Sequence, residues 1–558
     1  MNKYLKFEYW NTCDLGNIYY QGGQHFIFYL DADVGEPIHE EVEEGQENGD
    51  GDFIPTYRRQ IKRYRIRTGL IPDFLIDAMQ RMKLHDNIEL TFKTGEVEQI
   101  YNVDIEPEWQ FEKYAWQGTV TMTFDMDESI TVGACCDNLN VEESHIPLNE
   151  PAYFLAPDGD DDTGDGTVNN PWFTLEKAWA AVLAGDTIYM RGGTYEYTTR
   201  QDLIGKSGSI GSLINIFAYP GETPIITDDA TYNPDIQGQL IYITADYLHI
   251  RGLEISYFEQ RLGSRAWSAL FCTPTNHSIF ELINYHHNGS AMVIEGTSDD
   301  NLVLNCDFHH NYDPYGRTPY DGSSYAYEDA DGLNIREVDY GCYNTVRGCR
   351  AWSNADDGFD FWGNDGYVLT DGCWAWNNGY REDGITTGGN GAGFKTGETS
   401  DYSAEYLRTV QNCLSFNNRQ FGISQNGALC MHYIYNNAIY NNLYRGIYFS
   451  TTWGDIAHVV RNNIAYNNPT NFLGPPNTIV DHNSWQGGLV VSDADFLSVV
   501  STGANGTRQA DGSLPVLQFL HLASGSDLIN AGTDVGLTTD CDGENWDNPA
   551  PSLGAFEY

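Results

Sequence analysis

The residues best suited to chemistry are four aspartates and a lysine in the second half of the chain: Asp331, Asp356, Asp357, Asp360 and Lys395. Carboxylates gathered in one place repel one another unless a cation neutralises them, and oxygen ligands of this kind suit Ca²⁺. An amine beside such a site is suited to accept a proton, because burial and a bound cation both lower its pKa. The alternative from spacing alone is a ladder of surface salt bridges that stabilises neighbouring strands.

A repeat of about 24 residues would position these side chains. The repeat is marked by an Asn that lies five positions after an apolar residue, Cys or Asn: Asn288, Asn311, Asn354, Asn378, Asn418, Asn442 and Asn468. A unit of this length, rich in β-branched and aromatic residues and without helical periodicity, predicts one coil of a parallel β-solenoid. Equivalent positions then form columns along its axis, about 4.8 Å apart. We expect the Asn residues to form a hydrogen-bonded ladder, and the cysteines of the repeat to form a buried column: Cys306, Cys349, Cys373 and Cys413.

A second motif, a small residue followed by an apolar one, sets the register of the chemical residues. It recurs along the repeat: Ala291-Met292, Gly332-Leu333, Gly358-Phe359, Gly393-Phe394, Gly422-Ile423 and Gly446-Ile447. The apolar residue should point inward and the next residue outward, because strand side chains alternate. Asn334, Asp360 and Lys395 then form one outer column. From Gly332 onward, the position before the Gly forms another: Asp331, Asp357, Ala392, Phe421 and Arg445.

Composition limits the classes of function. The 558 residues include 79 Asp and Glu but only 30 Lys and Arg, so the formal net charge is −49. This charge argues against a nucleic-acid partner, whose phosphates need basic contacts. An acidic polymer remains a suitable substrate if a divalent cation reverses the local charge. We expect no membrane span, no secretory signal at the N-terminus and, from 11 scattered cysteines, no disulfide framework.

We divide the chain into an α+β domain at residues 1–147 and a β-solenoid at residues 148–558. The first domain contains an acidic segment, Glu36 to Asp52, with eight carboxylates, which we interpret as a solvated loop. The basic run from Arg58 to Arg67 alternates with apolar residues and predicts a strand. We also predict a helix and three further strands: Asp73 to Met82, Ile88 to Phe92, Val97 to Val103 and Gly118 to Phe124.

Three motifs of the solenoid resemble the pectate lyases of polysaccharide lyase family 9: Asp329 to Arg336, Gly348 to Asp360 and Gly391 to Gly397. Weaker matches, such as Gly185 to Tyr195 and Gly554 to Tyr558, extend the resemblance over roughly residues 151–558. The resemblance implies a mainly β protein with a right-handed parallel β-helix.

The resemblance also implies a set of roles. It makes the four aspartates ligands of Ca²⁺ and Lys395 the base that removes the C5 proton of a uronate during β-elimination. Only a neutral amine accepts that proton, so an alkaline optimum is expected. The chain departs from the family at Arg336, where the family tends to have Lys, so the substrate could differ from plain polygalacturonate. We predict that an acidic polysaccharide is bound by Arg336, Asn334, Arg419 and Arg445.

Two stretches of the first domain, Arg65 to Leu75 and Trp109 to Thr119, resemble virion domains of tailed bacteriophages of gut bacteria. The resemblance implies a tail protein made in the host cytoplasm, with residues 1–147 attached to other tail proteins and the β-helix degrading a polysaccharide. Tailspikes are commonly homotrimers whereas the lyase family acts as monomers, so the oligomeric state stays open. The alternatives are a silent receptor-binding tail protein, a secreted bacterial pectate lyase, and a hydrolase that uses Asp357 and Asp360.

Overall fold

The computed structural model divides the chain into two compact units, Met1–His145 and Ile146–Tyr558. The second unit is described over residues 152–228, 238–261, 267–315, 325–398, 407–450, 457–546 and 550–558. In the first unit the structure describes Met79 and the strands given below. Within these described parts, no helix has the length and apolar character needed to cross a membrane.

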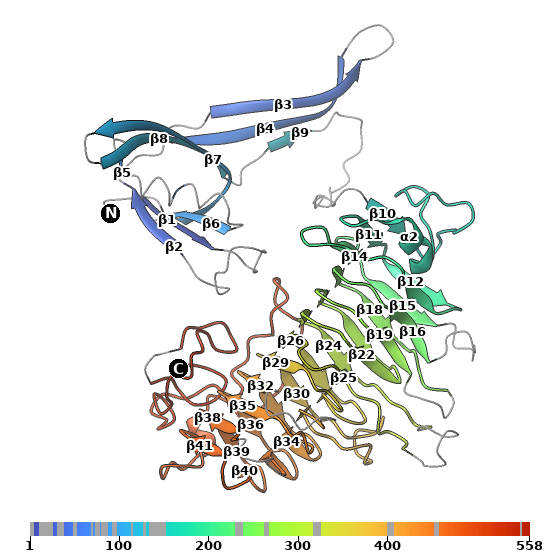
Figure 1. Ribbon diagram of the computed structural model, residues 1–558, viewed down its shortest axis with the longest axis vertical. Helices are drawn as coiled ribbons and strands as arrows, with labels where there is room; N and C mark the ends of the chain where they lie inside the picture. Colours follow the sequence, from blue (N-terminus) through green and yellow to red (C-terminus); the bar gives the residue numbers. More distant parts are fainter. Residues whose placement is uncertain are drawn as a thin grey trace. The chain divides into compact units, whose positions relative to one another are not determined.

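The first unit contains a nine-stranded antiparallel sheet in which β2, β1, β6, β7, β8, β4 and β3 lie side by side, while β5 pairs with β8 and β9 with β4 (Figure 1). Its strands are β1 (Leu5–Trp10), β2 (Phe26–Leu30), β3 (Ile38–Glu47), β4 (Phe53–Arg67), β5 (Ile71–Pro72), β6 (Asn87–Thr91), β7 (Val97–Glu112), β8 (Ala115–Met126) and β9 (Ile130–Val132). The strands predicted near residues 58–67, 88–92, 97–103 and 118–124 are confirmed. The helix predicted for residues 73–82 lies outside the described residues except for Met79, which is helical and buried.

The interpretation of the acidic segment as a loop was wrong over most of its length. Strand β3 occupies Ile38–Glu47 and pairs antiparallel with β4, so that Glu43 lies opposite Arg58 and Val42 opposite Arg59. The physical reason is the basic strand beside it, because opposite charges on paired strands favour the sheet.

The second unit is a right-handed parallel β-helix of three sheets, as predicted (Figure 1). The first sheet contains β10 (Ala152–Leu155), β11 (Thr187–Met190), β14 (Ile214–Ala218), β17 (Leu248–Arg251), β20 (Ile279–Glu281), β23 (Asn301–Leu304), β26 (Tyr343–Arg347), β29 (Tyr367–Asp371), β32 (Leu407–Gln411), β35 (Met431–Tyr435), β38 (Val459–Arg461) and β41 (Ile479–Asp481). The second contains β12 (Gly193–Tyr197), β15 (Pro224–Asp228), β18 (Glu254–Ser256), β21 (Asn284–His286), β24 (Asp307–His309), β27 (Arg350–Trp352), β30 (Trp374–Trp376), β33 (Leu414–Phe416), β36 (Ala438–Tyr440) and β39 (Ile464–Tyr466). The third contains β13 (Gln201–Leu203), β16 (Gln239–Ile243), β19 (Ser268–Cys272), β22 (Ser290–Gly296), β25 (Leu333–Val338), β28 (Phe359–Asp360), β31 (Phe394–Lys395), β34 (Phe421–Ser424), β37 (Arg445–Tyr448) and β40 (Phe472–Leu473).

Helix α2 (Leu175–Ala181) covers the first coils at the N-terminal end of the β-helix (Figure 1). Its apolar residues Leu175, Ala178 and Trp179 are buried in the same core as the strands that follow. The side chain of Thr174 caps the helix by accepting a hydrogen bond from the N–H of Lys177. The helix therefore shields the open end of the apolar interior from water.

The predicted Asn ladder and Cys column are both confirmed. From Asn311 onward, each Asn side-chain oxygen accepts the backbone N–H of the equivalent Asn one coil earlier, as in the 3.1 Å bond from Asn418 to Asn442. Its Nδ2 meanwhile donates to an earlier coil, for example from Asn418 to the carbonyl of Ala375. These bonds satisfy buried turn groups that an apolar side chain would leave unpaired. The cysteines Cys306, Cys349, Cys373 and Cys413 are buried and free.

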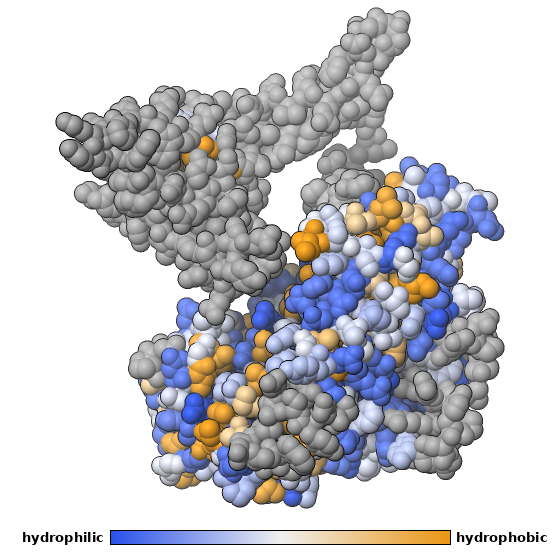
Figure 2. All heavy atoms as spheres, viewed as in Figure 1, coloured by the Kyte–Doolittle hydropathy of each residue, from blue (hydrophilic) through white to orange (hydrophobic). Residues whose placement is uncertain are grey.

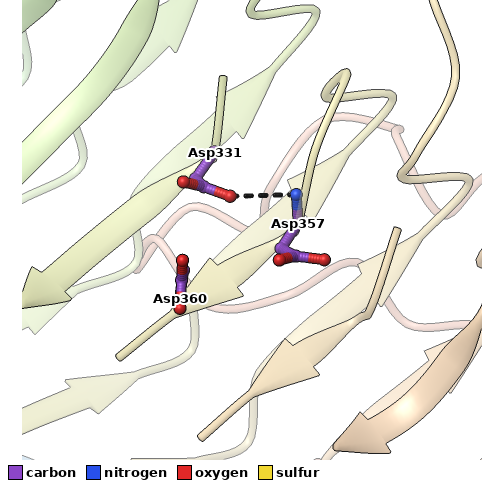
Figure 3. Close-up of side chains that lie close together, drawn as sticks. All are labelled: Asp331, Asp357 and Asp360. Atoms are coloured by element: carbon purple, nitrogen blue, oxygen red, sulfur yellow. Dashed lines mark hydrogen bonds between the residues drawn. The ribbon is translucent and has the colours of Figure 1, made fainter. Parts of the chain in front are cut away.

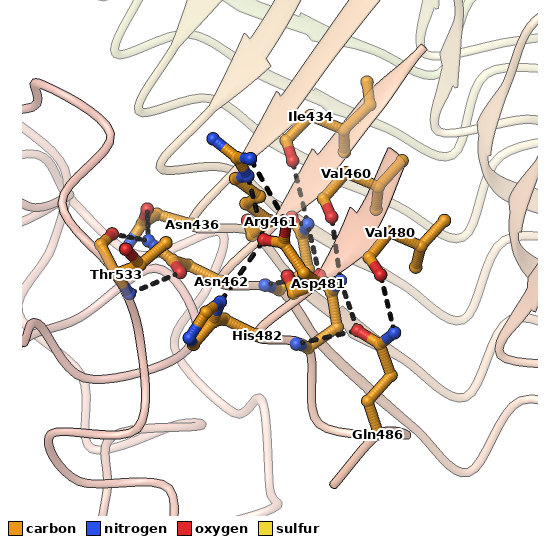
Figure 4. Close-up of polar contacts among 12 residues, drawn as sticks. Ile434, Asn436, Val460, Arg461, Asn462, Val480, Asp481, His482, Gln486 and Thr533 are labelled. Carbon is orange, nitrogen blue, oxygen red and sulfur yellow. Dashed lines mark hydrogen bonds and ion pairs between the residues drawn. The ribbon is translucent and has the colours of Figure 1, made fainter. Parts of the chain in front are cut away.

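A second Asn column, formed by Asn437, Asn463 and Asn483, ends at the last coil, where Gln486 takes the place of a further Asn (Figure 4). Asn483 Nδ2 donates to the carbonyl of Val460, and Gln486 supplies the oxygen that accepts the Asn483 N–H. Gln486 Nε2 also donates to the carbonyl of Val480, a contact that an Asn of a further coil would otherwise make. The longer Gln side chain thus satisfies the exposed end of the ladder from within the same coil.

The C-terminal segment, described at residues 482–546 and 550–558, packs against the outer face of the second sheet. An aromatic column of this sheet is buried, with Trp352 and Trp376 stacked at 4.8 Å and covered by an apolar cluster that includes Phe519 and Leu528. Asn462 Nδ2 donates to the carbonyl of Thr533, and Asn462 Oδ1 accepts the Thr533 N–H. These two bonds hold the same segment in place (Figure 4). Elsewhere, the β-helix face visible in Figure 2 is mainly hydrophilic, with hydrophobic residues in small separate groups.

Candidate active site

The third sheet brings the predicted chemical residues into register. Strands β25, β28 and β31 are neighbours, and their Cα partners are Asn334 with Asp360 and Asp360 with Lys395. The preceding positions pair Leu333 with Phe359 and Phe359 with Phe394, and these three side chains are buried in the core. The column deduced from the Gly-apolar motif is therefore confirmed.

The chemical residues are far less exposed than an outer face would suggest. Lys395 is 7% exposed, Asp360 5% and Asp356 0%. One cause is the β30–β31 loop (residues 377–393), which lies over the site. A Cβ at Gly389 would be only 2.3 Å from both Asp356 Oδ1 and the carbonyl oxygen of Tyr327. Because glycine has no side chain, this loop can pack directly on the carboxylates.

Asp331, Asp357 and Asp360 point toward one another from two neighbouring coils, with Asp331 just before β25, Asp357 just before β28 and Asp360 within β28 (Figure 3). Each offers a carboxylate oxygen, and these three oxygens lie within 4.8 Å of one another. Asp331 Oδ1 also accepts the backbone N–H of Asp357 at 2.9 Å (Figure 3). Lys395 Nζ lies 3.0 Å from Asp357 Oδ2 and 3.0 Å from Asp360 Oδ2. The amine is thus held between two of the three carboxylates.

Asp356 faces the β30–β31 loop and lies outside that group of three. Its Oδ1 accepts a short hydrogen bond from the N–H of Asn390, and Asp357 Oδ1 accepts one from the N–H of Ala392 at 2.5 Å. Among the described residues, no hydrogen bond reaches the buried atoms Asp356 Oδ2 and Asp360 Oδ1. Buried carboxylate oxygens without donors fit a site built to hold a cation, and an all-oxygen donor set is the kind that Ca²⁺ prefers.

The electrostatics of the site show how strongly its charges are coupled. Burial and the neighbouring carboxylates raise the pKa of Asp331 and Asp356 well above the usual range. Burial also raises the pKa of Asp360 to about 6, although Lys395 lowers it. Burial by itself lowers the pKa of Lys395. The surrounding carboxylates raise this pKa by more than burial lowers it, so it lies well above its usual range. The sequence predicted the opposite direction for Lys395, on the assumption that a bound cation offsets the aspartates.

The side chains of the predicted sugar-binding residues contact different kinds of partner. Arg336 Nε binds Glu295 at 2.8 Å, and Asn334 Nδ2 lies 3.3 Å from Ser290 Oγ. Arg419 Nη2 donates to the carbonyls of Gly389 and Asn390, so it holds the loop that covers the aspartates.

Arg445 lies farther along the third sheet than the other predicted sugar-binding residues. Its guanidinium is over the rings of Tyr444 and Tyr448. Along the axis, Arg445 therefore lies beyond Lys395, whereas Arg336 lies on β25, the strand that directly follows Asp331.

Sequence reasoning missed two features that complete the site. Glu295 has a signal in the sequence, because it lies four positions after Ala291 just as Arg336 lies four positions after Gly332. The N–H donors of Asn390 and Ala392 have none, because backbone groups of a loop carry no residue-type pattern. Only the pair Gly388-Gly389 indicates that a backbone approaches something closely.

Comparisons with known proteins identify relatives of this β-helix. A family model described as "Pel9A-like, right handed beta helix region" matches residues 153–463. Pectate lyase L of Dickeya chrysanthemi is 30% identical over 414 residues, which cover 73% of this chain and 90% of that protein. Pectate lyase PEL9 of Emericella nidulans is 29% identical over 410 residues, covering 69% and 94%. The crystal structure of pectate lyase Pel9A superposes with a TM-score of 0.60 at 27% identity, covering 73% of this chain and 96% of that one.

The fold and these relatives define a polysaccharide lyase of the pectate lyase type, built on a right-handed parallel β-helix. The chain belongs to the Pel9A-like family.

Proposed function

We propose that this protein cleaves a uronic-acid-containing polysaccharide by calcium-dependent β-elimination, with Lys395 as the base. The observation that carries the proposal is the position of Lys395 Nζ, 3.0 Å from two carboxylates of a buried acidic group. Asp331, Asp356, Asp357 and Asp360 would hold the ion, since they are the buried oxygen donors of the site. Calcium, when bound, supplies positive charge that attracts the uronate carboxylate and offsets charge developing toward C5.

The chain's own residues perform the remaining steps. Asp357 and Asp360 hold the Lys395 side chain from two sides, which fixes the direction of its nitrogen. With the charge of the aspartates offset by a cation, the Lys395 amine would be neutral. It takes the C5 proton, the C5–H electron pair forms the C4–C5 double bond, and the C4–O bond breaks with its electron pair on the oxygen of the departing sugar, which takes up a proton from water. Arg336, Asn334, Arg419 and Arg445 are proposed to contact the sugar chain or to position the groups that do.

The test is an incubation of the full chain with polygalacturonate and with bacterial capsule polysaccharides, in the presence of Ca²⁺ or a chelator. We expect Ca²⁺-dependent absorbance from unsaturated uronate products. Lys395→Ala should remove this signal while its circular dichroism and thermal transition stay close to the wild type. Saturated products with new reducing ends would instead indicate a hydrolase. Carbohydrate binding without products, unchanged in Lys395→Ala, would indicate a silent receptor-binding protein.

The proposed setting is the tail of a bacteriophage, with residues 1–147 attached to other virion proteins. Two observations support it: the first unit lies outside the residues matched by the family model, and its two motifs resemble virion domains. A secreted bacterial pectate lyase is the second candidate, favoured by the bacterial relatives of the β-helix. Mass spectrometry of purified phage particles from the source distinguishes the two. Light scattering of the full chain tests the homotrimer, which a tailspike favours over a monomer.

A further inference from the structure

Four side chains gather on the third sheet beyond the acidic group: Phe421, Tyr444, Arg445 and Tyr448. We call them the aromatic–arginine cluster. The Arg445 guanidinium carbon lies 4.1 Å from the ring centre of Tyr444 and 4.5 Å from that of Tyr448. Phe421 stacks on Tyr448 with ring centres 5.1 Å apart and an interplanar angle of 11°. The rings thus hold the guanidinium in a defined place by cation–π contacts.

The cluster continues the two columns that carry the candidate active site. Ser424 is the strand partner of Lys395, and Tyr448 is the strand partner of Ser424. Phe421 and Arg445 are partners of each other and occupy the repeat position that Asp331 and Asp357 hold earlier in the chain. Tyr448 therefore lies two strand spacings from Lys395, roughly 10 Å, which is comparable with the length of a disaccharide.

Unlike the other aromatic column, the cluster is open to solvent. Tyr444 is 48% exposed, and Phe421, Arg445 and Tyr448 are partly exposed. On the second sheet, by contrast, Trp352 and Trp376 are covered by the C-terminal segment. Within the described residues, no carboxylate forms a salt bridge with Arg445, although most other arginines of the β-helix have one or bind backbone carbonyls. A held, partly exposed guanidinium that forms no salt bridge with any described residue is suited to an external carboxylate.

We propose that the aromatic–arginine cluster is a binding subsite for an acidic sugar of the same polysaccharide chain, two coils from the base. The exposed ring of Tyr444 offers an apolar surface to the C–H face of a pyranose, Tyr448 holds the Arg445 guanidinium in place, and Arg445 binds the sugar carboxylate. The subsite rests on the proposed function, since it extends the track on which Lys395 acts. It makes the enzyme favour chains long enough to place a uronate at Lys395 and another at Arg445.

The experiment measures kcat/KM of the full chain with Ca²⁺ on uronate oligosaccharides of increasing length. In the wild type we expect kcat/KM to rise at the length that first reaches the cluster. Arg445→Met and Tyr448→Ala should each lose about tenfold on the longer oligosaccharides and remain near wild type on the shortest, as expected for one charge-assisted contact or one stacked ring. Arg445→Lys and Tyr448→Phe, which keep the charge or the ring, should recover part of the loss.

Tyr343→Ala is the matched control. Tyr343 is 55% exposed and stacks on Tyr367 at 4.2 Å, but it lies on the first sheet. Removing it takes away a stacked, exposed tyrosine without touching the track, so the length dependence should be unchanged.

Binding to the uncleaving Lys395→Ala protein, measured by calorimetry, separates this proposal from the proposed function. If no uronate polymer is cleaved but Arg445→Met weakens oligosaccharide binding in that background, the subsite stands and the lyase activity falls. If the wild type cleaves and the cluster variants match it at every length, the subsite is overturned and the lyase activity stands.

Discussion

Arg419→Met tests whether the β30–β31 loop prepares the acidic group for its cation. Arg419 Nη2 donates to the carbonyl of Asn390 at 2.7 Å and makes a shorter contact with that of Gly389. The same turn of the loop donates the N–H groups that bind Asp356 Oδ1 and Asp357 Oδ1. Arg419 therefore acts on the aspartates through the backbone between them. Methionine keeps the approximate volume of the side chain and removes the hydrogen-bond donors together with their positive charge.

The size of the effect follows from the two bonds that are lost. A hydrogen bond from a charged donor contributes about 1.5–3 kcal/mol, and partial exposure of Arg419 places each of these near the lower limit. The loop therefore loses about 3 kcal/mol of local stability. Loss of an outer-shell partner typically weakens a metal site by about 10–100-fold. We expect the Ca²⁺ dissociation constant to rise within that range, which corresponds to about 1.4–2.7 kcal/mol.

Two measurements on the full chain check this expectation. Calorimetry gives the Ca²⁺ affinity directly, and the rate at saturating substrate is followed as Ca²⁺ is titrated. The variant should need more Ca²⁺ for half-maximal rate yet approach the wild-type kcat at saturation. Arg461→Met is the matched control, since Arg461 pairs with Asp481 near the last coil and has no contact with the loop.

One result would refute the reasoning. If Arg419→Met keeps the wild-type Ca²⁺ affinity and raises only KM, Arg419 contacts the sugar directly and the loop is held by other contacts. That outcome would restore the substrate-binding role predicted from the sequence.

Three further predictions concern the loop, the Asn ladder and the stacked histidines. Gly389→Ala should weaken Ca²⁺ binding, because its Cβ would be 2.3 Å from Asp356 Oδ1; calorimetry checks this, and an unchanged affinity would mean that the loop moves freely. Asn418→Ala should lower the free energy of unfolding in urea by about 3 kcal/mol, since it removes the acceptor of the Asn378 N–H and the donor to the Ala375 carbonyl. Burial lowers the pKa of His309 to about 2, so an unfolded chain binds a proton below pH 6.5 that the folded chain does not. Stability should therefore fall with decreasing pH from about 6.5 toward 2, by up to about 1.4 kcal/mol per pH unit for this residue, and His309→Phe should reduce the slope of unfolding free energy against pH.

The coil repeat made much of the site predictable. Asn334, Asp360 and Lys395 share one repeat position, and stacking of identical coils places such positions on neighbouring strands whatever the loops do. The same logic located the Asn ladder and the Cys column, and it could have located Glu295 beside Arg336. In a solenoid, sequence periodicity converts directly into contact, because each coil touches only the next.

Other features depended on contacts between segments that the coil repeat does not relate to one another. The burial of Lys395 comes from its carboxylate partners and from a loop whose path is set by Gly389 and Arg419. Strand β3 was misread because its acidic residues are explained only by the basic strand beside it. The sequence alone determined which residues share a column, since translation along the axis is built into the repeat. Only the tertiary structure decided which of those columns are covered, because loops and the C-terminal segment reach them from outside the repeat.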